Sequence, residues 1–222
     1  MKSFLFAAAA LMVAAGAAQA VPTVYNDAQN DLFDNGFSNL DIKSVSVDND
    51  ANNVYLTVET RGYQNWTKYM IYMNTGASDV TGTNGWGRPV NLTTQIDHYV
   101  GSWVDAGSNN QENRSWDGFN WNLDATTSND QSQIAANKVT FTISRSFLGL
   151  LGNGVILFDV ATSGGGGGDP GVDHLSRNDP ATTDWSVPST SGNFLAYTLQ
   201  VPTPGSLALI GMGGLLAARR RR

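Results

Sequence analysis

Short segments in which apolar and polar residues alternate constrain the fold of this chain more than any other feature of its sequence. Val54, Leu56 and Val58 are separated by polar neighbours. The same pattern recurs in six further segments, 45–47, 69–73, 96–100, 139–143, 156–160 and 195–199. Strict alternation is typical of β-strands with one buried face, and no comparable stretch shows the 3.6-residue period of a helix. The chain is therefore predicted to be all-β.

Residues 21–200 are predicted to form a single domain, because this length suits one hydrophobic core and no internal break divides it. Seven or more short strands joined by polar turns predict a two-sheet antiparallel β-sandwich of jelly-roll type, with a single barrel as the alternative. The sequence contains no cysteine. An exported chain of this kind must therefore be stabilised by packing or by ions instead of disulfides.

The N-terminal residues 1–20 have the pattern of a secretory signal peptide. Lys2 gives a positive start, an apolar run follows from residue 4 to residue 15, and Ala18-Gln19-Ala20 forms a small-x-small cleavage site. We expect cleavage after Ala20, so that the mature chain leaves the cytoplasm.

Residues 201–222 form a second terminal segment of distinct composition. Pro202-Thr203-Pro204 precedes an uncharged apolar run, residues 205–218, and the chain ends with Arg219, Arg220, Arg221 and Arg222. An apolar helix of this length would span only about 21 Å, against roughly 30 Å for the hydrocarbon core of a bilayer. The terminal arginines would stay on the cytoplasmic side. The segment therefore predicts a transient inner-membrane anchor, with a plain C-terminal membrane anchor as the alternative.

This order of Pro-x-Pro, apolar helix and arginine cluster resembles the PEP-CTERM sorting signal. The resemblance implies recognition and processing by a membrane transpeptidase, exosortase, although Thr203 stands where the family has glutamate. Residues 27–58, in which aspartates lead into two alternating segments, are loosely similar to DOMON-type and other carbohydrate-binding β-sandwich modules. That second similarity implies a fold and transfers no ligand residue.

The charge of the body limits its partners. The two terminal segments hold five of the 13 basic residues and none of the 19 acidic ones, so the body carries 8 basic and 19 acidic residues, a net charge of −11. Such a surface repels nucleic acid and other anionic polymers and favours cations or neutral sugars.

A calcium site is the candidate metal centre. Asp48, Asp50 and Asn52 occupy positions 1, 3 and 5 of a calcium-loop pattern. Position 6 lacks the usual glycine, and a strand-like segment follows where an EF-hand needs a helix. The turn is therefore predicted either to be a solvated hairpin turn or to form a simpler calcium site, to which the fold would bring Asp27 or Asp31.

Trp86 and Trp185 are the candidate glycan contacts, because both lie in polar loop sequence and flat indole faces stack on pyranose rings. The alternative for each is to anchor a long loop to the sheets. We predict no enzyme. The only glutamates are Glu59 and Glu112, the only histidines are His98 and His174, and no Gly-x-Ser-x-Gly elbow is present.

Together these patterns predict an exported protein of the cell surface, outer envelope or extracellular matrix with a structural or adhesive role. The alternative is a carbohydrate-binding module presented by the same route, and a glycan-active enzyme is the third class. The expected partners are an exosortase-type sorting enzyme and a surface polysaccharide.

Overall fold

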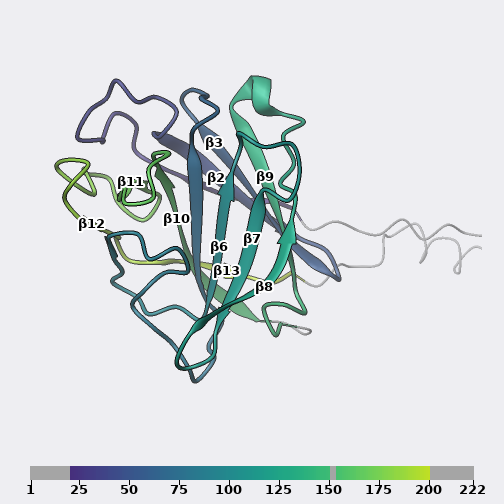
Figure 1. The fold of residues 1–222 in the computed structure, drawn as a ribbon. Coiled ribbons are helices and arrows are strands. Elements are labelled where there is room, and N and C mark those ends of the chain that lie inside the picture. The colour runs from purple at the N-terminus through teal and green to yellow at the C-terminus, as the bar shows by residue number, and fades with distance from the viewer. Residues whose placement is uncertain (1–20, 151–153, 201–222) are drawn as a thin grey trace, which may run out of the picture.

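The structure is a computed structural model and describes residues 21–150 and 154–200 (Figure 1). In these residues the chain forms strands β1 to β13 and a short 3-10 helix, η1 (Ile134–Ala136). The predicted signal peptide (1–20) and sorting segment (201–222) lie outside the described residues.

One sheet has four antiparallel strands in the order β1-β2-β3-β9. Its strands are β1 (Thr23–Asn26), β2 (Ile42–Asn49), β3 (Asn53–Thr60) and β9 (Lys138–Ser144). In the register of this sheet, Val47 lies opposite Leu56, which lies opposite Phe141. The apolar residues of the alternating segments therefore share one face.

The other sheet has seven strands, with the path β11-β10-β4-β6-β7-β8 and β13 paired to β10. Its strands are β4 (Lys68–Asn74), β6 (His98–Trp103), β7 (Gln111–Trp116), β8 (Trp121–Thr127), β10 (Val155–Ser163), β11 (Gly171–His174) and β13 (Leu195–Thr198). All of these pairings are antiparallel. A separate parallel pair joins β5 (Val90–Asn91) to β12 (Ser189–Thr190).

The main core lies between the two sheets. Val45, Leu56 and Phe141 from the four-stranded sheet pack in one cluster with Ile71 and Phe158 from the seven-stranded sheet. Each of these side chains is buried. Burial on this scale removes about 25 cal/mol of unfavourable hydration per Å² of apolar surface, so this layer is the main source of stability.

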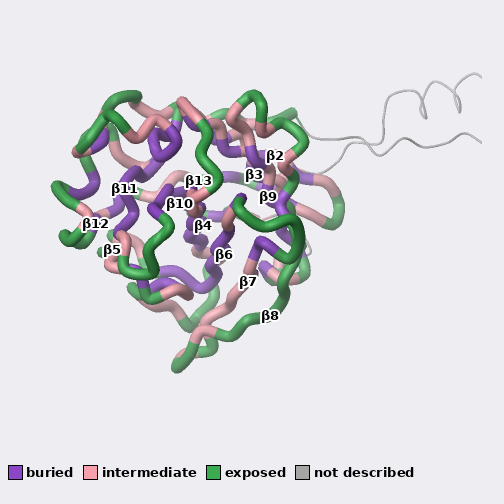
Figure 2. The backbone as a smooth tube through the Cα atoms, turned by 45° about the horizontal axis from the view of Figure 1, so that its top comes forward, coloured by how far each residue is buried: buried purple, intermediate pink, exposed green. Residues whose placement is uncertain are grey.

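A second core covers the outer face of the seven-stranded sheet. Met70 and Tyr72 of β4 pack there with Tyr99 of β6, and Trp86 and Phe194 from loops cover them. Strand β4 is consequently buried on both faces, whereas β8 at the sheet edge is exposed along most of its length (Figure 2). Loops that are held on a rigid sheet in this way commonly carry binding groups.

The prediction of an all-β fold with antiparallel sheets is confirmed, and the two layers pack as in a β-sandwich. The alternating segments coincide with β2, β3, β4, β6, β9, β10 and β13. The finer jelly-roll assignment stays a prediction. Among the described residues, no helix is long and apolar enough to span a bilayer.

Candidate metal centre

Four aspartates from separate parts of the sequence gather where the loop between β1 and β2 packs against β11. Asp27 directly follows β1, and Asp41 directly precedes β2. Asp31 lies in the loop between them, and Asp173 lies in β11. The centre therefore joins a loop of the four-stranded sheet to a strand of the seven-stranded sheet.

The carboxylates are close enough to share one cation. Asp31, Asp41 and Asp173 each offer one oxygen, and these oxygens lie within 4.8 Å of one another. Two ligands of a calcium ion, each 2.3–2.6 Å from it, are separated by at most about 5 Å. The spacing of the three oxygens fits a single ion.

Several oxygens of the centre are buried without a hydrogen-bond partner in the described part of the chain. They are Oδ1 of Asp41, Oδ2 of Asp27 and both carboxylate oxygens of Asp31. Asp41 as a whole has no exposed surface. Because a buried, unpaired carboxylate oxygen is strongly unfavourable, these oxygens are candidate ligands for a cation.

Backbone amides orient the carboxylates from the other side. The Asn30 amide donates to Oδ2 of Asp41 at 2.9 Å, and the Ile42 amide donates to Oδ2 of Asp173 at 2.6 Å. Asn30 adopts a left-handed backbone conformation with φ of 66°, which asparagine tolerates better than most residues. This turn places Asp31 back toward Asp41.

Negative charge exceeds positive charge at the centre. Arg61 is the one basic residue paired to any of the four aspartates in the described structure, with Nη1 3.2 Å from Oδ2 of Asp41. Burial, then the charges of Asp173 and Asp31, raise the pKa of Asp27 to about 9. Burial likewise raises the pKa values of Asp31, Asp41 and Asp173. A divalent cation would offset these unfavourable charges.

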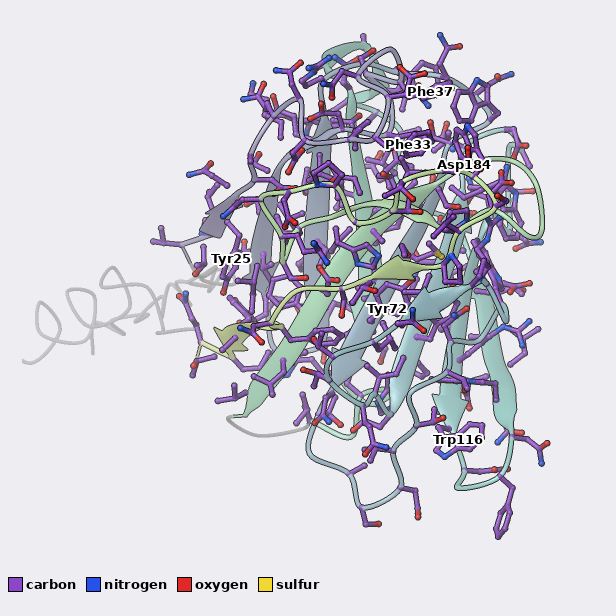
Figure 3. The ribbon with its side chains drawn as sticks, turned by 90° about the vertical axis from the view of Figure 1, so that its left-hand side faces the viewer. Tyr25, Phe33, Phe37, Tyr72, Trp116 and Asp184 are labelled. Atoms are coloured by element: carbon purple, nitrogen blue, oxygen red, sulfur yellow. The ribbon has the colours of Figure 1, made fainter. Side chains whose placement is uncertain are left out.

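An apolar cluster holds the loop between β1 and β2 in place. Leu32 and Leu40 of the loop are buried against Val172, the residue before Asp173. Phe33 and Phe37 of the same loop lie close together at one end of the molecule (Figure 3), where each contacts the Trp185 ring edge to face, with centroids 5.5 and 5.2 Å away. The loop that carries Asp31 is therefore fixed by packing.

The predicted ligands Asp48, Asp50 and Asn52 lie elsewhere. They flank the turn between β2 and β3, at the opposite end of β2 from Asp41, roughly 23 Å away at 3.3 Å per residue. Asp50 accepts hydrogen bonds from the amides of Asn52 and Asn53, both at 2.7 Å. The turn is thus closed by its own carboxylate, and calcium binding there stays a prediction. The expected contributors Asp27 and Asp31 are instead grouped with Asp41 and Asp173.

The two predicted glycan contacts belong to different clusters. Trp185 packs on Phe33 and Phe37, which places it at the loop between β1 and β2. Trp86 packs over β6 and faces Trp103, with ring centroids 6.3 Å apart. Trp86 and Trp185 are not brought into one cluster.

A buried Asp-His-Ser chain joins β10, β11 and β12. His174 Nδ1 lies 2.6 Å from Oδ2 of Asp159, and its Nε2 lies 3.3 Å from Oγ of Ser189. This is the order of a catalytic triad. All three side chains are completely buried. The Ser189 hydroxyl also accepts a hydrogen bond from the Gly171 backbone amide at 3.1 Å. The arrangement encloses its hydroxyl, so it serves here as a polar link between strands.

Comparison with known proteins gives no relative for this chain: no protein-family model matches it, and neither does a curated protein or a solved structure.

Proposed function

We propose that this chain is an exported structural or adhesive protein whose β-sandwich is held together at one point by a bound calcium ion. The observation that carries the proposal is the group formed by Asp31, Asp41 and Asp173, with Asp27 beside it and several buried oxygens unpaired. Bound calcium would link the loop between β1 and β2 to β11. In this cysteine-free chain, the ion would cross-link two parts of the fold, as a disulfide does in other exported proteins.

Calcium fits the donor set better than the other common metals. All the donors are hard carboxylate oxygens, whereas zinc and copper sites in proteins usually include histidine or cysteine. Magnesium demands a near-ideal octahedron and usually keeps several waters, but calcium accepts irregular, buried oxygen cages. Extracellular modules bind calcium with dissociation constants of about 0.1–1 mM.

The terminal segments support export. A signal peptide ending at Ala20 and the PEP-CTERM-like segment 201–222 would deliver the body to the cell surface, outer envelope or extracellular matrix through an exosortase-type enzyme. The jelly-roll form of the sandwich and the absence of catalysis belong to the same proposal. A carbohydrate-binding module is the second candidate function, and the contact between Trp86 and Trp103 favours it.

Thermal unfolding with and without calcium tests the proposal. With calcium at about 100 times its dissociation constant, binding to the folded state adds about 2.7 kcal/mol. For a domain of this size, we expect the Tm to rise by about 5–10 °C relative to a sample in EDTA. An unchanged Tm would overturn the calcium centre.

Asp31→Asn gives the sharper comparison, because neither Asp31 oxygen accepts a hydrogen bond in the described structure. The substitution removes one negative charge, so in EDTA the variant should be as stable as the wild type or more stable. With calcium, however, it should lose most of the gain in Tm. Asp124→Asn, at an exposed site on β8, is the matched control and should keep the full gain.

The double variant Asp48→Asn, Asp50→Asn separates the two calcium sites. It should be less stable in both buffers, since Asp50 closes a turn, but it should keep the calcium-dependent rise in Tm. If the rise disappears in this variant and persists in Asp31→Asn, the hairpin turn is the calcium site instead.

A further inference from the structure

A groove over the outer face of the seven-stranded sheet has the features of a ligand site. It has a volume of about 220 Å³ and is lined by Lys68, Trp86, Arg88, Trp103 and Gly167. Strand register explains why these residues meet. Lys68 at the start of β4 lies opposite Trp103 of β6 on one side and opposite Ser163 of β10 on the other. The five-glycine loop begins at the next residue after Ser163.

One wall of the groove is a fixed aromatic surface. The indole Nε1 of Trp86 donates to Oε2 of Glu112 at 2.8 Å, and Arg114 pairs with the same oxygen at 3.0 Å. Beneath the ring lies Gly101, where a Cβ atom would come within 2.2 Å of it. Trp103 continues the wall, with its ring plane tilted 36° from that of Trp86. Aromatic groups fixed before binding lose little entropy when they contact a sugar ring.

A buried cation without a carboxylate partner also lines the groove. Arg88 is only 7% exposed, and no ion pair involves it in the described residues. Its Nη1 donates to Oγ of Ser163 at 2.6 Å and to the carbonyl of Asp169 at 3.1 Å. The Asp169 carboxylate does not pair with Arg88 but accepts a hydrogen bond from the Gly166 backbone amide. Burial lowers the pKa of Arg88.

The remaining charges strengthen the case for an anionic ligand. The Arg88 guanidinium lies 5.4 Å from the centre of the Trp86 ring, so a cation–π contact offsets only part of its desolvation. Lys68 adds a second positive charge, which is shared with the exposed Asp105 at 2.8 Å. A site with two cations is unusual on a body whose net charge is −11. A guanidinium fork matches a carboxylate, and indole rings match a pyranose.

We infer that the groove between Trp86 and Trp103 binds a carboxylate-bearing pyranose, a uronic acid unit of an acidic polysaccharide, with Arg88 and Lys68 facing the carboxylate. The inference names the polymer class for the adhesive role and so rests on that part of the proposed function. It does not depend on the calcium centre. Because Lys68 is already paired with Asp105, the buried Arg88 guanidinium is the group that selects an acidic sugar over a neutral one.

Isothermal titration of the full body with trigalacturonate and with neutral cellotriose tests the inference. We expect binding of trigalacturonate that weakens with added salt, and no measurable binding of cellotriose. Trp103→Ala should weaken binding at least tenfold by removing part of the aromatic wall. Lys68→Gln should weaken it several-fold, and both variants avoid the buried Arg88.

Matched controls separate loss of the groove from loss of the fold. Trp116→Ala removes another half-buried tryptophan of this sheet, and Lys138→Gln removes another lysine paired to a carboxylate. Both should bind within twofold of the wild type. Equal binding of the two trisaccharides, or full binding by Trp103→Ala, would overturn the inference.

The Tm of each sample with calcium and with EDTA is measured in parallel. Calcium stabilisation without binding of trigalacturonate refutes the groove and leaves the calcium centre standing. Binding of trigalacturonate without calcium stabilisation supports the groove and refutes the centre.

Discussion

His98, at the start of β6, is held between two oxygen acceptors. Its Nδ1 lies 2.9 Å from Oδ1 of Asp97, and its Nε2 lies 2.9 Å from the carbonyl oxygen of Phe147. Asp97 also accepts hydrogen bonds from the backbone amides of Thr75 and Ala77, at 2.9 and 3.1 Å. One carboxylate therefore ties the loop after β4 to β6. Because the loop after β4 leads on to Trp86, this contact also supports the groove.

The state of Asp97 predicts how stability depends on pH. Burial alone would raise its pKa, but the hydrogen bonds from His98, Thr75 and Ala77 together lower it below its usual value. The unfolded chain therefore binds more protons than the folded one in mild acid, so this contribution is present above about pH 4 and is lost as the pH falls through the folded pKa.

Urea unfolding of Asp97→Asn between pH 2 and 7 measures this contribution. The variant should be less stable than the wild type near pH 7, and the difference should shrink as the pH falls below about 4. Asp124→Asn, whose side chain is exposed, should track the wild type throughout. A difference that stays constant across the whole range would show that Asp97 acts through packing alone.

At the residue scale, two of the four clustered aspartates could not be predicted from the sequence. Asp27 and Asp31 were predicted as contributors to a metal site, but Asp41 and Asp173 were not. In the sequence, Asp41 has the pattern of a polar residue at the start of a strand. Asp173 follows a glycine-rich loop and precedes a histidine. The packing of Leu32 and Leu40 against Val172 and the hydrogen bond from the Ile42 amide to Asp173 bring them together, and no short-range spacing encodes these contacts.

At the scale of elements, alternation identified β2, β3, β4, β6, β9, β10 and β13. It missed β7 and β8 and the short strands β1, β5, β11 and β12. The inward side chains of β7 include Gln111 and Asn113, which are polar yet buried. The side-chain Nε2 of Gln111 donates to the Thr142 carbonyl at 2.9 Å, so β7 places a polar contact across the sandwich where other strands place apolar side chains. A polar strand of this kind has no hydrophobic period to detect.

Strand β8 predicts an uneven distribution of local stability. Among the described strands it pairs with β7 alone, and the pairing shifts register between Asn113 and Arg114. Six of its seven residues are exposed, whereas β4 lies between two strands and under two cores. Amides at an exposed edge open with little loss of apolar contact.

Native-state hydrogen exchange followed by mass spectrometry checks this. Amides of β8 should exchange at least tenfold faster than those of β4. The comparison with β9, the edge of the other sheet, is an internal control, because the Asp130 amide donates to the Thr140 carbonyl at 2.8 Å and covers part of that edge. Equal protection of β8 and β4 would mean that β8 is covered by something other than β7.

At the scale of the whole molecule, the last described residues are bonded to the body at a place separate from the proposed calcium centre. The Gln200 amide donates to Oδ1 of Asn49 at 2.8 Å, and Nδ2 of Asn49 donates back to the Gln200 carbonyl at 2.9 Å. Tyr197 donates its hydroxyl to the same Asn49 oxygen at 2.8 Å. Asn49 is completely buried. These hydrogen bonds therefore hold the chain against the body as far as Gln200, two residues before Pro202.

Because the chain is held at Gln200, the proposed cleavage near Pro204 would release a body that is still folded. Proline fixes φ and restricts the residue before it, so Pro202 and Pro204 favour an extended segment that a membrane transpeptidase could reach without unfolding β13. Cleavage near Pro204 would remove the apolar run and the four arginines together. It would leave the hydrogen bonds of Asn49 intact.

The intact mass of the protein recovered from the surface or medium of its native host measures both ends at once. We expect a species that begins at Val21 and ends near Pro204, with or without an added group. Replacing Pro202 and Pro204 with alanine should yield a species that keeps residues 205–222 while the body folds unchanged. If the wild type itself keeps residues 205–222, the segment is a plain membrane anchor. The matrix role would then lose its delivery route, but the calcium centre and the groove would remain to be tested on the anchored protein.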